Sequence, residues 1–285
     1  MCWTPPRLDG TVAVVTGATR GVGRGVALAL GDAGATVYVT GRSTVAETAA
    51  EVSARGGRGI GVRTDHTDDR QVQALFARVR AEAGRLDLLV GNAWGGYADH
   101  DPRTFAAPFW QQPLTRWQTM FEAGLRLQLT SAWFAAPLLL AQRHGLVVLT
   151  GGWDDPADYL GNLPYDLAKS ATSRLVATLA HELRPHGVAV VGAYPGFTRT
   201  EAVVAAFAAA NLAPPPQAHS PEYVGRAVAH LAADPDVGAL SGQGFQVATL
   251  ARRYRFVDVD GRSFERFRMP EEYRLQPERH EPPDG

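Results

Sequence analysis

The stretch "TVAVVTGATRGVGRGVALAL", residues 11–30, decides the fold. Its first part is a β-branched run that ends in glycine, which is typical of a buried parallel strand. A glycine-rich turn follows, and then apolar residues recur on one face of a helical pattern that stops at Gly34. A strand, a glycine-rich turn and a helix in this order predict the first unit of an α/β fold that binds a phosphate group.

The spacing of Gly17, Gly21 and Gly23 suits a dinucleotide. A side chain at these positions would keep a pyrophosphate away from the backbone amides and the positive end of the helix. The last glycine is not followed by a Lys-Ser or Lys-Thr pair, which disfavours a nucleoside-triphosphate loop. A tight turn with close helix–sheet packing and no ligand is the alternative, and the strand–turn–helix setting favours dinucleotide binding over it.

Apolar runs alternate with helical patterns along the rest of the chain. Further strands are expected at residues 36–41, 59–65, 86–93, 145–151, 188–196 and 242–248, and helices at 45–55, 68–82, 114–143, 165–184 and 221–233. Residues 197–220 are expected to be irregular, and the charged tail from Arg252 is expected to end in a frayed "EPPDG". The alternation predicts a doubly wound parallel sheet, a Rossmann fold, in a single domain over residues 1–285, with its core at about 8–248 and a tail at 249–285.

Composition narrows the class of protein. The net charge is -1, which implies no broad attraction to nucleic acid or to an anionic membrane. A single cysteine, Cys2, excludes an internal disulfide framework and fits a reducing compartment. The start has no signal-peptide pattern, the apolar stretch at 131–141 is too short to span a bilayer, and the eight histidines show no metal-ligand spacing. We expect a cytoplasmic protein that acts on a small molecule.

The end of the second expected strand indicates the cofactor. An acidic residue there would bind a ribose 2′-hydroxyl and repel a phosphate, but the strand ends in Thr40, Gly41, Arg42 and Ser43. Arg42 can pair with a 2′-phosphate, Ser43 can add a hydrogen bond, and Arg20 of the glycine turn can approach the same group. Either arginine alone could be a solvated surface charge. The absence of an acid between residues 36 and 43 favours NADP(H) over NAD(H).

Four motifs together carry a resemblance to the short-chain dehydrogenase/reductase family. They are "TGATRGVG" at 16–23, "GNA" at 91–93, Tyr165-x-x-x-Lys169 and "PGFTRT" at 195–200, and the likeness runs from about residue 8 to residue 248. The segments "GNAWGG" at 91–96 and "LARRYRFVDVDGR" at 250–262 are similar to its dehydrogenase/reductase member-one subgroup.

The resemblance implies a set of cofactor-binding residues. It places Asp65 at the adenine amino group, Asn92 along the adenosine ribose and Thr200 on the nicotinamide side. It further implies a homodimer or homotetramer built on the helix around residues 125–140 and the helix after Tyr165. The full set of expected cofactor contacts is Gly17, Thr19, Arg20, Gly21, Val22, Gly23, Arg42, Ser43, Asp65, Asn92, Ala93, Lys169, Pro195, Gly196, Thr198 and Thr200.

Tyr165 and Lys169 are the candidate catalytic pair. A tyrosine has an ordinary pKa of about 10 and is a poor base near neutrality. A lysine one helical turn away lies on the same face, and its charge favours the phenolate. Tyr165 is therefore the expected acid/base of a carbonyl reduction, with Lys169 tuning it and, by the resemblance, binding the nicotinamide ribose. The alternative is a surface Tyr–Lys pair on a helix, which the other motifs disfavour.

Two positions depart from the family pattern. The family has a serine about 13 residues before the tyrosine, and that position here is Gly152; its long helix has an asparagine, and the aligned residue here is Gly124. Loss of one oxyanion donor costs roughly 100- to 1,000-fold in rate. Thr150, or the backbone amides of Gly151 and Gly152, could partly substitute. Asp154 and Asp155 either form a turn with Pro156 or contact the substrate.

The sequence therefore leaves two alternative functions. One is an NADPH-dependent carbonyl reductase or alcohol dehydrogenase with a rearranged site. The other is an NADP(H)-binding protein without net redox turnover, either a redox-neutral catalyst or a regulator. The variable segments suggest a bulky, apolar substrate, although each aromatic could equally be loop packing or an oligomer contact. The candidate pocket walls are Trp94, Tyr97, Trp153, Tyr159 and Phe197.

Overall fold

The computed structural model describes residues 3–96, 105, 107–152, 155, 157–269, 271 and 275. Its centre is a seven-stranded sheet in the order β3-β2-β1-β4-β5-β6-β7, in which every neighbouring pair is parallel. The predicted doubly wound parallel sheet is confirmed. The strands are β1 (Val12–Val15), β2 (Thr36–Gly41), β3 (Arg58–Arg63), β4 (Leu88–Gly91), β5 (Gly145–Thr150), β6 (Val188–Tyr194) and β7 (Gly244–Gln246).

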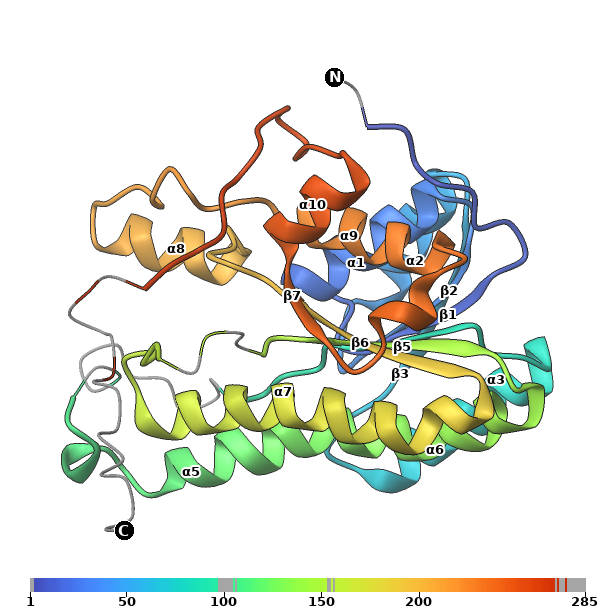
Figure 1. Ribbon diagram of the computed structural model, residues 1–285, viewed down its shortest axis with the longest axis horizontal. Helices are drawn as coiled ribbons and strands as arrows, with labels where there is room; N and C mark the ends of the chain where they lie inside the picture. The colour runs from blue at the N-terminus through green and yellow to red at the C-terminus, as the bar shows by residue number, and fades with distance from the viewer. Residues whose placement is uncertain are drawn as a thin grey trace, which may run out of the picture.

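Helices cover both faces of the sheet (Figure 1). One layer contains α1 (Gly21–Asp32), α2 (Val45–Ala54), α9 (Pro221–Ala233) and α10 (Val247–Tyr254), and the other contains α3 (Asp69–Ala83), α6 (Arg126–Gln142) and α7 (Leu163–Leu183). Successive residues of a strand point to opposite faces. Ala13 and Val15 accordingly join the first core, whereas Val12 and Val14 join the second. Two-sided burial explains why β1 is apolar throughout.

The expectation of an irregular segment at residues 197–220 is wrong in its first half. Residues Glu201–Ala209 form α8, and Thr200 caps it by accepting a hydrogen bond from the Val203 amide at 3.3 Å. Alanine is the strongest helix former, and an acidic residue in the first turn complements the helix dipole. The alanine run is therefore a helix signal.

The core does not end near residue 248. Helix α10 begins directly after β7, and Leu250, Ala251 and Phe256 belong to the buried core. Further along the tail, buried Asp258 accepts hydrogen bonds from the amide and hydroxyl of Ser220. These bonds anchor the tail at the start of α9, so its first part is packed against the sheet layer.

The long helix expected at residues 114–143 is interrupted. It consists of α5 (Thr115–Met120), a π-helical segment (Phe121–Leu125) and α6. π-Helical segments inside α-helices are frequently found at functional sites. This one contains Gly124, one of the two positions at which the chain departs from the family pattern.

The chain reverses its winding direction between β1 and β4. In open α/β sheets, ligands bind outside the carboxyl ends of the strands at such a switch point. The glycine turn after β1, residues 91–96 after β4, the loop after β5 and the segment after β6 all leave the sheet at this edge. The fold therefore brings the four motifs of the sequence to one side of the molecule.

Candidate functional site

The glycine turn between β1 and α1 is fastened to the end of β4. The Asn92 side-chain amide donates to the carbonyl oxygens of Thr16 at 3.0 Å and Gly17 at 3.2 Å. The Thr16 hydroxyl accepts from the backbone amides of Asn92 and Ala93, both at 2.9 Å. A Cβ on Gly23 would lie 2.2 Å from the Gly17 carbonyl oxygen. Asn92 and Ala93 thus hold the turn in shape, a supporting contact that the sequence did not predict.

The start of α1 presents a backbone amide to an anion. Gly21 has a φ of +53°, and its amide donates to the Glu201 carboxylate at 2.8 Å. The methyl group of Thr200 lies against the same glycine, at 3.3 Å from where a Cβ would stand. The Gly21 amide thus binds a negatively charged oxygen, the kind of group that the pyrophosphate of a dinucleotide presents. Val22, the next residue, is partly buried against the core of the α1 side.

The residues expected at the adenosine end lie around the ends of β2 and β3. Arg42 and Ser43 directly follow β2 and are exposed, as is Arg20 at the N-cap of α1. Thr19 packs against Gly41, whose Cβ would lie 2.8 Å from the Thr19 methyl. Hydrogen bonds from Thr67 lower the pKa of Asp65, and the nearby charge of Arg42 adds to this. Asp65 is thus held as an ionised hydrogen-bond acceptor close to the positive charge of Arg42.

The segment after β6 leads from the sheet to α8. Pro195 and Gly196 follow the strand, the Thr198 hydroxyl donates to the Gly196 carbonyl at 3.4 Å, and Thr198 forms a bridge with His219. Thr200 then caps α8 and touches the glycine turn. The turn after β1 and the segment after β6 are therefore in contact at the carboxyl edge of the sheet.

Tyr165 and Lys169 lie on consecutive turns of α7. Asn162 caps this helix by accepting from the Tyr165 amide at 3.0 Å, and its own side-chain amide donates to the Phe105 carbonyl at 2.7 Å. Lys169 is only 7% exposed, and its ammonium nitrogen lies 5.4 Å from the centroid of the Tyr165 ring. Burial lowers the pKa of Lys169 to about 7. The structure thus brings the predicted catalytic pair together.

Trp94 lies against this pair. The Lys169 Nζ atom is 3.3 Å from the centroid of the Trp94 ring, and the Trp94 and Tyr165 rings meet edge to face at 6.3 Å. A Cβ on Gly124 would lie 2.8 Å from the Trp94 ring, and one on Gly96 would also lie 2.8 Å from it. Trp94 therefore occupies the space in front of Gly124, and the sequence signal for this was a bulky aromatic between small residues in "GNAWGG".

Gly152 has no room for the serine that the family pattern places there. A Cβ at this position would lie 2.5 Å from the Tyr194 ring and 2.6 Å from the Ser173 hydroxyl oxygen. Tyr194 is buried at the end of β6 and fills this space. The Thr150 hydroxyl, considered as a substitute, donates instead to Asn92 at 3.1 Å. Tyr194 and Ser173 were missed because neither stands near Gly152 in the sequence.

The remaining aromatic candidates fall into two groups. Tyr97 and Trp153 lie outside the described residues, together with Asp154 and Pro156. Burial raises the pKa of Tyr159, which stands in the loop before α7. Phe197 contacts Phe207 of α8 edge to face at 6.0 Å and lines a hollow of about 150 Å³ beside Gly196.

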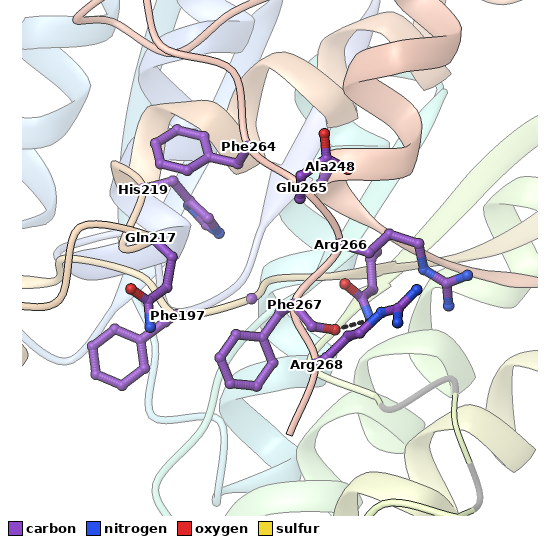
Figure 2. A pocket seen from close by; sticks show the side chains of 11 residues that line it. Phe197, Gln217, His219, Ala248, Phe264, Glu265, Arg266, Phe267 and Arg268 are labelled. Carbon is purple, nitrogen blue, oxygen red and sulfur yellow. Dashed lines mark hydrogen bonds between the residues drawn. The ribbon is translucent and has the colours of Figure 1, made fainter. Parts of the chain in front are cut away.

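The C-terminal tail forms one wall of that hollow (Figure 2). Residues 264–268 cross in front of the ends of β6 and β7, and the Gln246 side chain donates to the Phe267 carbonyl at 3.0 Å. Further on, the Leu275 amide donates to the Ala157 carbonyl at 2.6 Å, which joins the tail to the loop between β5 and α7. The tail therefore borders the carboxyl edge on which the site lies.

The described part of the chain has neither a helix that could span a membrane nor a cluster of metal-binding side chains. Across residues 3–96 and the later described segments, the helices are too short or too polar for any of them to cross a bilayer. Within the same residues, His, Cys, Asp and Glu side chains do not gather in groups of three that would hold a metal ion.

Comparison with known proteins agrees with this geometry. The model of the family described as short chain dehydrogenase matches residues 11–211. The mouse protein "Dehydrogenase/reductase SDR family member 1" is 40% identical over 268 residues, which cover 90% of this chain and 85% of that protein.

Solved structures share the fold. A metagenomic short-chain oxidoreductase in complex with NADP is 26% identical with a TM-score of 0.68, over 84% of this chain and 96% of that one. A 7α-hydroxysteroid dehydrogenase complexed with NADH and 7-oxo glycochenodeoxycholic acid is 24% identical with a TM-score of 0.71, over 84% and 93% of the two chains. The matched family, the glycine turn and the Tyr165–Lys169 pair agree: this chain belongs to the short-chain dehydrogenase/reductase family of oxidoreductases.

Proposed function

We propose that the protein is an NADPH-dependent oxidoreductase acting on a carbonyl or alcohol group of a bulky, apolar small molecule. One observation carries the proposal: Tyr165 and Lys169 lie side by side on α7, with Lys169 buried, at the sheet edge where the glycine turn presents its amide to an anion. A tyrosine beside a buried lysine next to a dinucleotide cradle suits proton transfer coupled to hydride transfer.

The chain's own residues have separable roles in this proposal. The glycine turn from Gly17 to Gly23 holds the pyrophosphate, and Arg42 with Ser43 holds the 2′-phosphate. NADPH, when bound, supplies the hydride. Tyr165 donates a proton to the carbonyl oxygen as negative charge develops there, and Lys169 favours the phenolate that remains. Asp65, fixed by Thr67, accepts from the adenine amino group.

The direct test is NADPH oxidation over a panel of cyclic and aromatic ketones and aldehydes. We expect turnover with at least one apolar carbonyl compound. Cofactor binding, followed by nicotinamide fluorescence, without consumption on any member of the panel would contradict the oxidoreductase proposal.

That second outcome defines the alternative function. A protein that binds NADP(H) without net redox turnover, as a redox-neutral catalyst or a regulator, is favoured by one observation. The space for a serine side chain at Gly152 is filled by Tyr194 and Ser173, so the usual hydroxyl donor to the substrate oxygen has been replaced by packing.

Arg42 should decide the cofactor preference. Replacing it with alanine removes a charge-assisted hydrogen bond to the 2′-phosphate, a contact worth ~1.5–3 kcal/mol. We expect Arg42→Ala to weaken NADPH binding roughly 10- to 100-fold and to leave NADH binding nearly unchanged, as measured by fluorescence titration. Arg58→Ala is the matched control, because Arg58 is exposed at the opposite end of the neighbouring strand. An equal loss for both cofactors would argue against a 2′-phosphate contact.

We further propose a homodimer or homotetramer built on the α6–α7 face. Leu129, Trp133 and Leu140 recur at helical spacing along α6 and are exposed, Trp133 by 73%, and Leu167 on α7 is exposed as well. Apolar side chains of this size in one patch mark an interaction surface. Light scattering after gel filtration should give at least twice the mass of one chain, and Trp133→Glu should reduce it to one. A monomeric wild-type protein would contradict this.

A further inference from the structure

Trp94 has an environment that only a planar ring fits. Its indole lies between the π-helical segment at Gly124 and the ammonium group of Lys169. A Cβ on Gly124 would stand 2.8 Å from Cζ3 of the ring, and a Cβ on Gly96 would stand 2.8 Å from Cε2. A side chain at either glycine would collide with the ring, so both glycines leave the space that the indole occupies beside the candidate catalytic lysine.

The contact with Lys169 has the geometry of a strong cation–π interaction. The Nζ atom is 3.3 Å from the ring centroid, well inside the ≈ 6 Å range over which an ammonium is attracted to an aromatic face. Tryptophan is the most favourable partner, and the attraction is larger where water is excluded. Lys169 is excluded from water, since it is buried and a Cβ on Gly151 would stand 2.8 Å from the same nitrogen. The indole face thus supplies part of the stabilisation that the ammonium loses on leaving water.

The same ring also contacts Tyr165. The two rings meet edge to face with centroids 6.3 Å apart and planes at 86°. Trp94 therefore touches both members of the pair. A ring that is fixed by two glycines and touches both groups can set the distance between them.

We propose that Trp94 is a positioning residue of the site: its indole face holds the Lys169 ammonium against Tyr165, in the space that Gly124 leaves open. The inference rests on the proposed function, because the pair matters only where Tyr165 moves a proton. The proposal also explains Gly124. A side chain at this position would exclude the Trp94 ring, so the glycine is needed where the family pattern has an asparagine.

A double-mutant cycle tests the contact without cofactor. Urea unfolding is measured at about pH 6, below the Lys169 pKa of about 7, so that the side chain is an ammonium group in the folded protein. The proteins compared are the wild type, Trp94→Leu, Lys169→Met and the double variant. Leucine keeps apolar volume but has no aromatic face. We expect Trp94→Leu to raise the unfolding equilibrium constant about 5- to 30-fold more in the wild type than in the Lys169→Met background. Equal effects in both backgrounds would overturn the proposal.

Activity then separates positioning from packing. We expect Trp94→Leu to lower kcat about 10- to 100-fold while the KM for the carbonyl substrate changes little, and Trp94→Phe, which keeps a ring, to recover most of that loss. Gly124→Ala should resemble Trp94→Leu, whereas Gly238→Ala should match the wild type, because its Cβ meets open space among the described residues. Equal losses for the leucine and phenylalanine variants would overturn the proposal.

Failure of the proposed function looks different. A wild-type protein that does not oxidise NADPH with any carbonyl compound of the panel, yet shows the Trp94–Lys169 coupling on unfolding, refutes the oxidoreductase activity alone. If the wild-type protein is active but the double-mutant cycle shows no coupling between Trp94 and Lys169, only the role of Trp94 is refuted.

Discussion

Tyr165→Phe should lower kcat/KM for NADPH-dependent carbonyl reduction by about 100- to 10,000-fold, the usual contribution of a positioned acid/base group. The change removes one hydroxyl and keeps the ring, so the edge-to-face contacts of Tyr165 with Trp94 at 6.3 Å and Phe105 at 5.8 Å should remain. The fold around the variant should therefore be intact, and the loss should appear in the chemical step.

The measurement is steady-state NADPH oxidation with the best carbonyl compound of the panel. NADPH binding, measured separately by fluorescence, should change less than about threefold, because Tyr165 is assigned to the substrate oxygen. Tyr254→Phe is the matched control, because it removes a tyrosine hydroxyl that bonds Asp234 at the end of α9 and should retain activity. Activity unaffected by Tyr165→Phe would remove the acid/base assignment and leave only the family and the fold.

Lys169 should make the stability of the protein depend on pH in an identifiable window. Burial lowers its pKa from 10.5 to about 7, so between these values the unfolded chain binds a proton that the folded chain does not. The free energy of unfolding therefore rises with pH across this window and is lowered as pH falls through it. At 1.36 kcal/mol per pKa unit, the change between pH 7 and pH 10 is roughly 3 kcal/mol.

Lys169→Met isolates this contribution. The variant keeps most of the side-chain length but does not titrate, so every other group cancels in the comparison. We expect the stability of the wild type to improve relative to Lys169→Met as the pH is raised from 7 to 10, by urea unfolding at fixed ionic strength. A difference that stays flat would show that the ammonium persists in the folded protein, with the face of Trp94 offsetting the whole cost of burial.

Local signals predicted the regular elements well where the chain carries clear boundaries. The strand expected at residues 36–41 is β2 with the same bounds, because a β-branched run between Gly34 and Gly41 has few other choices. The helix expected at 221–233 is α9, in which Pro221 follows the capping residue Ser220. The glycine spacing likewise predicted the turn that joins β1 to α1 at the carboxyl edge of the sheet.

Local signals were also available for α8 and were misread. Thr200 followed by Glu201 and an alanine-rich run has both a cap and strong helix propensity, yet the prolines further along suggested an irregular segment. The break in the long helix had no comparable signal. A π-helical segment adds one residue to a turn, and Gly124 alone did not reveal it.

The sequence by itself determined the parallel sheet, the glycine turn, the edge at which the motifs meet and the pairing of Tyr165 with Lys169, because each depends on residues close together in the chain. Only the tertiary structure decided what fills the space around the pair. Tyr194 lies against Gly152, Trp94 lies between Gly124 and Lys169, and Asp258 closes on Ser220, in each case across 30 or more residues. Such contacts depend on shape and exclusion of water rather than on periodicity, so a pattern of residue types does not contain them.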